Sequence, residues 1–149
     1  MVFIEDIGST FDAPLDKVWK LGEAHAKDGD KIHPNTRNNK TEIVNETTFI
    51  NSWEEDMNGQ TIKTKAKGTM YYPLGVAFEI LEGPFAGSKF FTYYIPKDNN
   101  KTSVNVVGDF RSTTILDDEQ LKSIVIGFLE KVHNEDVAYL AKNTVIDCY

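Results

Sequence analysis

The chain lacks several features that define whole classes of protein. Its 149 residues include a single cysteine, Cys148, at the penultimate position. An internal disulfide is therefore excluded, and a cytoplasmic location is the expectation. No apolar run approaches the roughly 20 residues that a membrane-spanning helix needs. The chain also does not begin with a basic segment followed by an apolar stretch, so neither a secretory signal nor membrane insertion is expected.

Positive charge is scarce as well. The sequence has 16 Lys and Arg against 23 Asp and Glu, a net charge of −7, and the basic residues form no cluster. A nucleic-acid-binding surface normally carries a basic patch that neutralises phosphates, and this sequence has none. Anionic membrane surfaces are disfavoured for the same reason. We therefore expect no nucleic-acid partner.

Motifs for metals and cofactors are missing too. Neither a Gly-x-x-x-x-Gly-Lys-Ser/Thr nor a Gly-x-Gly-x-x-Gly pattern occurs, so nucleotide cofactors are not predicted. His25, His33 and His133 are far apart and have no cysteine near them, so no metal site is predicted. Glu130 and His133 form one Glu-x-x-His, but a carboxylate-bridged di-metal site needs two such motifs. We interpret that segment as a solvated helix face.

The composition is that of a globular domain. Hydrophobic residues make up 40% of the chain and charged residues 26%, which is the ordinary range for a folded protein. A length of 149 residues suffices for one domain with a real core. No linker, internal repeat or low-complexity segment divides it, so one domain over residues 1–149 is predicted.

The first elements follow from local patterns. Residues 2–11 have strand character, with Phe3, Ile7 and Phe11 on one face. Pro14 fits the first turn of a helix, which is expected to run from Pro14 to about Ala26. The polar, Gly/Asn/Pro-rich residues 27–40 predict a loop with room for a second short helix.

Strand patterns separated by turn signals fill residues 41–112 and predict an antiparallel meander. Asn58-Gly59 is the strongest of these signals, because a two-residue hairpin turn of this type needs positive φ at both positions. It sets a register in which Met57 lies opposite Gln60. One face of this hairpin then pairs Glu54 with Lys63, which predicts a solvated surface.

The other face of the hairpin has the composition of a ligand pocket. Counting back from the turn places three facing pairs on it: Trp53 with Thr64, Asn51 with Ala66 and Phe49 with Gly68. Aromatic side chains opposite small residues, with a few polar groups, are typical of a site for a small molecule. The alternative is that a helix fills this space and Asn51 bonds to the backbone. The same inward parity continues through Val76, Phe78, Ile80, Phe90, Thr92, Tyr94, Val104, Val106, Gly108 and Phe110.

The residues that alternate with these inward positions would lie on the outer face of the sheet, and several of them are apolar. Leu81, Phe91, Tyr93 and Val107 would form an exposed apolar patch, which can mark a partner surface. A homodimer through this outer patch is therefore an expectation of the sequence.

The last element is a long helix. Asp117 is a suitable N-cap, and Gln120 lies three residues on, as in a capping box. Apolar residues then recur at helical spacing from Leu121 to Tyr139. A helix from Asp118 to about Lys142 would be about 35 Å long, enough to cross a sheet.

The string FDAPLDKVWKL, residues 11–21, resembles the start of proteins in the START, polyketide-cyclase and birch-pollen-allergen-like superfamily. The order of strand, Ala-Pro turn, helix, meander and long C-terminal helix matches that superfamily over the whole chain. The resemblance implies an α+β helix-grip fold, in which a curved antiparallel sheet wraps around the long C-terminal helix. Plant members carry a glycine-rich loop where residues 56–63 have one glycine, so a microbial cyclase-like or carrier branch fits better.

The resemblance also implies a hydrophobic cavity between the sheet and the long helix. Its lining would be Phe49, Asn51, Trp53, Thr64, Phe78, Tyr94, Val125, Phe128 and Val132. The leading hypothesis is a binding or carrier protein for a small lipophilic molecule, without a cofactor. A cyclase- or dehydratase-type enzyme is the alternative, with Glu5, His33 and Tyr94 as candidates for proton transfer. A third possibility is a protein-interaction module with a filled core.

Overall fold

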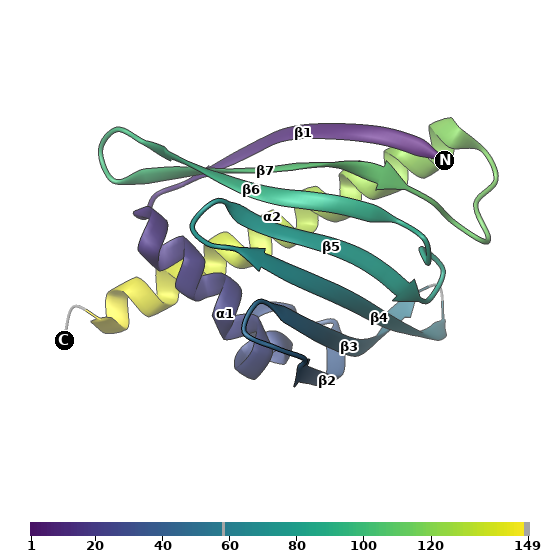
Figure 1. The fold of residues 1–149 in the computed structure, drawn as a ribbon, viewed down its shortest axis with the longest axis horizontal. Coiled ribbons are helices and arrows are strands. Elements are labelled where there is room, and N and C mark those ends of the chain that lie inside the picture. The colour runs from purple at the N-terminus through teal and green to yellow at the C-terminus, as the bar shows by residue number, and fades with distance from the viewer. Residues whose placement is uncertain (58, 148–149) are drawn as a thin grey trace.

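A single antiparallel sheet of seven strands forms the body of the described chain, with both helices packed against it (Figure 1). The computed structural model describes residues 1–57 and 59–147. The strands run in the order β1-β7-β6-β5-β4-β3-β2, and every neighbouring pair is antiparallel. The predicted α+β helix-grip architecture is confirmed. The elements are β1 (Val2–Phe11), α1 (Leu15–Ile32), β2 (Thr36–Ile43), β3 (Thr48–Met57), β4 (Gln60–Tyr71), β5 (Gly75–Glu82), β6 (Lys89–Lys97), β7 (Lys101–Phe110) and α2 (Asp118–Asp147).

The hairpin of β3 and β4 has the predicted register. Met57 pairs with Gln60, and Trp53 pairs with Thr64 four residues back along the strand. Gly59 has φ of 78°, as the turn requires, while Asn58 lies outside the described residues. The outer pair Glu54 and Lys63 forms an ion pair of 3.7 Å. The solvated face and the opposite face are therefore as the sequence predicted.

The parity predicted for β1 is wrong. Ile4 is the buried residue of its first half, whereas Phe3 is 72% exposed and Glu5 is exposed as well. The pairing of β1 with β7 shifts between Asp6 and Ser9. Because such a bulge inserts a residue, it reverses which side chains face inward on either side of it. Phe11, beyond the bulge, is buried as expected.

Helix α1 is longer than predicted. It extends to Ile32 with one non-helical residue, Asp28, at a kink. Residues 27–40 were expected to form a loop with room for a second short helix. The helical turn beyond the kink, which buries Gly29 and Ile32, lies in that segment and joins the first helix directly. Strand β2 then begins at Thr36, within the predicted loop, and its pairing with β3 shifts between Arg37 and Lys40.

Helix α2 begins where the sequence places it. The Asp117 carboxylate accepts a hydrogen bond of 3.0 Å from the backbone N–H of Gln120, which caps the first turn. In Figure 1 the helix runs diagonally behind the sheet, and it packs on β1 and β7. Neither helix of the described chain is both long and apolar enough to cross a bilayer.

Two core clusters hold the helices to the sheet. The first joins the N-terminal half of α2 to β1 and β7 through Ile4, Val106, Phe110, Leu121, Val125 and Leu129. The second joins α1 to the end of β1 and to β7 through Phe11, Ala13, Val18, Leu21, Ile32 and Val104. Both helices therefore cover the same face of the sheet, called the inner face below.

Candidate functional site

A row of aromatic rings crosses the inner face of the sheet. The Phe49 ring of β3 meets Phe78 of β5 edge-on at 6.3 Å, and Phe78 stacks on Phe90 of β6 at 5.1 Å. Phe90 in turn stacks on Phe110 at 5.2 Å. These contacts confirm the inward parity predicted for Phe49, Phe78 and Phe90. The row reaches from the core cluster at β7 out to β3.

Gly68 makes room for one end of this row. A Cβ placed on Gly68 would lie 2.2 Å from Cζ of Phe49, so the Phe49 ring lies over the bare glycine backbone. Phe49 lies opposite Gly68 in the register of the hairpin, and its ring occupies the space that a side chain at position 68 would fill. In this pair, the glycine allows an aromatic ring to pack directly on the backbone of the neighbouring strand.

The predicted polar lining lies on the same face. Thr41 donates a hydrogen bond of 2.5 Å to the side-chain oxygen of Asn51. The indole N–H of Trp53 points to the Glu55 carboxylate at 3.4 Å. Thr64, opposite Trp53, is buried. Asn51 therefore bonds to a neighbouring side chain, not to the backbone as the alternative interpretation held.

The three lining residues predicted on α2 differ in their surroundings. Val125 lies in the core cluster that joins α2 to β1 and β7. Val132 is half-buried. Phe128 is 47% exposed, so it is not the inward side chain that was expected and lies at the margin of the buried stripe of α2.

The inner face of β3, β4 and β5 is the least covered by helices. Helix α2 packs on β1 and β7, while α1 packs on β2, β6, β7 and α2. In the described residues neither core cluster includes Phe49, Trp53 or Phe78, and all three are half-buried. Large aromatic side chains here remain partly accessible beside a packed core.

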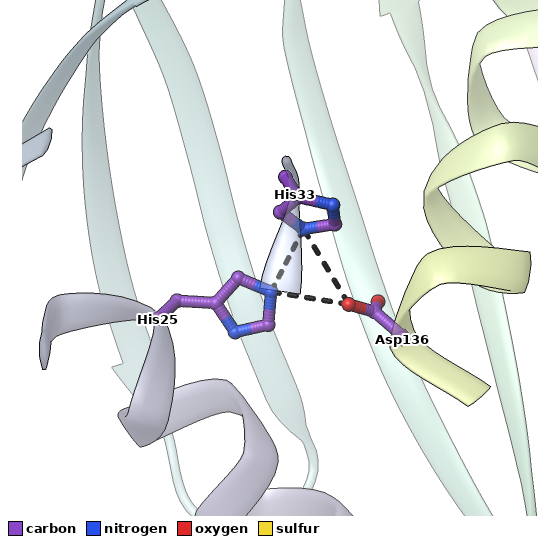
Figure 2. A group of neighbouring side chains, drawn as sticks. All are labelled: His25, His33 and Asp136. Atoms are coloured by element: carbon purple, nitrogen blue, oxygen red, sulfur yellow. Dashed lines mark hydrogen bonds and ion pairs between the residues drawn. The ribbon is translucent and has the colours of Figure 1, made fainter. Parts of the chain in front are cut away.

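A second group of side chains gathers where the two helices meet. Figure 2 shows His25 of α1, His33 just after α1 and Asp136 of α2 directed at one point. The two Nε2 atoms are 3.0 Å apart. Oδ1 of Asp136 is 3.2 Å from Nε2 of His25 and 3.4 Å from Nε2 of His33. The side chains of His25, His33 and Asp136, called the His–His–Asp cluster below, are 28%, 17% and 13% exposed.

The Nδ1 atoms of both histidines are engaged on their other sides. Nδ1 of His25 lies 2.8 Å from the backbone oxygen of Leu21. Nδ1 of His33 lies 3.3 Å from Oε1 of Glu135. Because a carbonyl oxygen and an ionised carboxylate only accept, each Nδ1 donates its N–H.

The surroundings move the two imidazole pKa values in opposite directions. Burial acts to lower the pKa of His25, but the hydrogen bond and the charge of Asp136 outweigh it, so the pKa lies above 6.5. Burial, together with the charge of His25, holds the pKa of His33 below its ordinary value despite Asp136 and Glu135. Neighbouring groups whose pKa values are shifted in opposite directions by their surroundings are typical of functional sites.

Tyr94 links this cluster to the inner face. It packs edge-on against Trp19 at 5.9 Å, and its hydroxyl lies beside Gly22 of α1. Burial and, secondarily, the charge of Asp136 raise the pKa of Tyr94 to about 12. The phenol is thus neutral over the physiological pH range and available as a hydrogen-bond donor.

The other sequence candidates lie apart from this cluster. Glu5, a candidate for proton transfer, is exposed on β1 and does not face the core that Ile4 enters. His133 is buried, with Nδ1 2.8 Å from the Ser9 hydroxyl, and its ring meets Phe11 edge-on. Glu130 is exposed. Glu130 therefore faces solvent while His133 faces the core, so the two side chains of the Glu-x-x-His motif do not converge.

The outer face of the sheet carries the predicted apolar residues. Val107 is 43% and Leu81 is 38% exposed. Phe91 stacks on Tyr93 at 6.0 Å and meets Tyr71 edge-on at 6.3 Å. A shallow open hollow next to them is lined in part by Ala77, Phe91 and Val107. A homodimer through this surface stays a prediction.

The sequence matches no family model, and no curated protein matches it. Solved structures are similar to it in fold. They include the Zhui aromatase/cyclase from Streptomyces sp. R1128, with a TM-score of 0.74 and 15% identity over 95% of this chain and 92% of that one. TTHA0849 from Thermus thermophilus gives 0.70 and 14% over 99% of both chains. Ara h 8.0201 gives 0.70 and 17% over 95% of this chain and 98% of that one.

These likenesses establish the fold. The chain has the helix-grip fold that the resemblance of residues 11–21 implied. The similar structures include a microbial cyclase and Ara h 8.0201, so membership of the START, polyketide-cyclase and birch-pollen-allergen-like superfamily, and of a branch within it, stays a prediction.

Proposed function

We propose that the protein binds a small, largely apolar molecule on the inner face of β3 to β6. The observation that carries this proposal is the row formed by Phe49, Phe78 and Phe90, whose outer members lie outside both core clusters. Partly accessible rings of this size gain about 25 cal/mol for each Å² of apolar surface that a ligand removes from water.

Polar groups at the margin of the row would orient the ligand. Asn51 retains its amide N–H₂ donors after its oxygen has accepted from Thr41. Tyr94 contributes a neutral phenol at the other side. A few fixed polar groups in an apolar site are how such sites select orientation. We infer a ligand with an apolar body and a small number of hydrogen-bonding groups.

Two tryptophans give this proposal a direct test. Trp53 lies on the inner face, and Trp19 lies on α1 against Tyr72 and Tyr94. In a Trp19→Phe background, Trp53 is the single indole of the chain. We expect a neutral lipophilic dye such as Nile red to bind saturably and to quench Trp53 by energy transfer.

Matched variants locate the binding. Phe78→Ala removes an inner ring, and Phe91→Ala removes a half-buried ring from the outer face of the adjacent strand. Loss of a ring contact worth about 1.4 kcal/mol or more should weaken dye binding in Phe78→Ala at least tenfold. Phe91→Ala should bind as the parent does. Equal losses in both variants, or a loss in Phe91→Ala alone, would contradict the proposed site.

An enzyme of the cyclase type is the second candidate. The His–His–Asp cluster, with one imidazole pKa raised and the other lowered, supplies groups for proton transfer next to Tyr94. Two measurements separate the carrier from the enzyme. In native mass spectrometry of the freshly purified protein, a retained molecule of a few hundred daltons supports a carrier. In an activity assay, turnover of a polyketide-like chain that His25→Gln abolishes supports an enzyme.

A further inference from the structure

The His–His–Asp cluster has an excess of lone pairs at its centre. Since each histidine donates its Nδ1–H, to Leu21 or to Glu135, the Nε2 atom of each neutral ring carries a lone pair. The ionised Asp136 carboxylate also only accepts. Three acceptor atoms therefore face one another at 3.0 to 3.4 Å, an arrangement that needs a cation or a proton between them.

The dimensions of this triangle match those of a metal centre. Zinc lies 2.0–2.1 Å from His nitrogen and 2.0–2.2 Å from carboxylate oxygen, in tetrahedral geometry. Two such ligand atoms are then about 3.3–3.4 Å apart. The observed separations of 3.0, 3.2 and 3.4 Å are close to the edges of that tetrahedron.

The atoms behind the triangle also match. Metal-ligating histidines donate their second ring N–H to a backbone carbonyl or a carboxylate, which fixes the tautomer and ring orientation. Here His25 uses the carbonyl of Leu21 and His33 uses the carboxylate of Glu135. With the proton on Nδ1, each imidazole presents the lone pair of Nε2, which is the atom that would bind the metal.

The junction between α1 and α2 positions the side chains of His25, His33 and Asp136. His25 precedes the kink at Asp28, and His33 follows the end of α1. The hydroxyl of Tyr139, one turn beyond Asp136 on α2, donates to Asp28 at 2.9 Å. This bond ties the kink to α2, so the positions of all three groups are set by one helix junction.

The geometry points to a mononuclear site for a divalent first-row transition metal, with Zn²⁺ as the best fit, ligated by Nε2 of His25, Nε2 of His33 and Oδ1 of Asp136. Two imidazoles and one carboxylate suit zinc and its neighbours over calcium or magnesium. Three protein ligands leave one tetrahedral position for water or a ligand atom. The site lies beside Tyr94, at the edge of the proposed binding face, and does not depend on that face being occupied.

Metal titration of the full chain tests this inference. Untagged protein stripped with a chelator is titrated with Zn²⁺ by calorimetry and with Co²⁺ by visible absorption. We expect one ion per chain and the intense bands of four-coordinate Co²⁺. His25→Ala, His33→Ala and the isosteric Asp136→Asn should each weaken Zn²⁺ binding at least a hundredfold, while circular dichroism reports on folding. Glu135→Gln, which alters a partner of a ligand, should weaken it 10- to 100-fold.

Two controls separate this site from other donors. His133→Asn changes the third histidine of the chain, and Cys148→Ser removes its one thiol, at a position outside the described residues. Each variant should bind Zn²⁺ with an affinity within twofold of that of the parent protein. Absence of saturable binding, or binding that survives both His25→Ala and His33→Ala, would overturn the site and leave a proton shared by the cluster. Azide should shift the Co²⁺ bands, and an unchanged spectrum would overturn the open position.

Discussion

Substitution of Gly68 by alanine tests how the inner aromatic row is built. The new Cβ would lie 2.2, 2.6 and 2.7 Å from three ring atoms of Phe49. Ordinary van der Waals contact begins near 3.4 Å, so the ring must retreat by about 1 Å. Because the obstructing atoms are at the far end of a half-buried side chain, the cost should be in the lower part of the roughly 1–3 kcal/mol range for overpacking.

A double-mutant cycle in urea measures this interaction directly. Gly68→Ala should destabilise the wild-type protein by about 1–2 kcal/mol. In a Phe49→Ala background the same change should be neutral or stabilising, because Ala is favoured over Gly in a strand by about 0.5–1 kcal/mol. The resulting coupling of about 1 kcal/mol or more is typical of residues in contact. Equal effects of Gly68→Ala in both backgrounds would refute the packing of Phe49 on Gly68.

Four further outcomes follow from described contacts. Gly108→Ala should be destabilising even with Phe90→Ala, because the carbonyl of Lys89 and Cα of Phe90 block its Cβ at 2.6 and 2.7 Å; relief in the double variant would contradict this. Gly127→Ala should raise the midpoint of thermal unfolding by about 2–4 °C, since its Cβ meets open space in a helix. Asp117→Ala should cost about 1 kcal/mol in urea denaturation through the lost cap. Ultraviolet titration should show one phenol with a pKa of about 12 that Tyr94→Phe lacks. That folded pKa lies above the unfolded value of 10.0, so the stability it contributes is complete below pH 10 and is lost between pH 10 and 12.

The hairpin shows what local chemistry can determine. Asn58-Gly59 specifies a turn of fixed length, and a fixed turn sets every pair behind it, down to Phe49 and Gly68. The parity of β5 to β7 followed from the alternation of side chains along each strand. The inward residues of β3 to β7 were therefore predictable from the sequence.

Two other features were beyond reach of the sequence. The bulge in β1 between Asp6 and Ser9 has no distinctive local signal, and because of it Ile4, not Phe3, faces the core. The His–His–Asp cluster combines side chains more than 100 residues apart in sequence, so only the packing of α1 on α2 brings them together. The residues between His25 and His33 did not indicate the cluster, because the kink that lets both histidines face Asp136 lies in a polar segment interpreted as a loop with room for a second short helix.

The irregular pairing in the two outermost strands has a consequence for self-association. β1 and β2 end the sheet on either side, and each has a break in its register, at Asp6/Ser9 and at Arg37/Lys40. An exposed edge with a regular row of unpaired backbone groups is a template for adding strands of another molecule, and bulges and charged side chains disrupt that template. Both rims of this sheet are therefore protected against fibre-like growth. Irregular edges therefore disfavour association through backbone hydrogen bonds, and the homodimer that the sequence predicts would use side chains of the outer face instead.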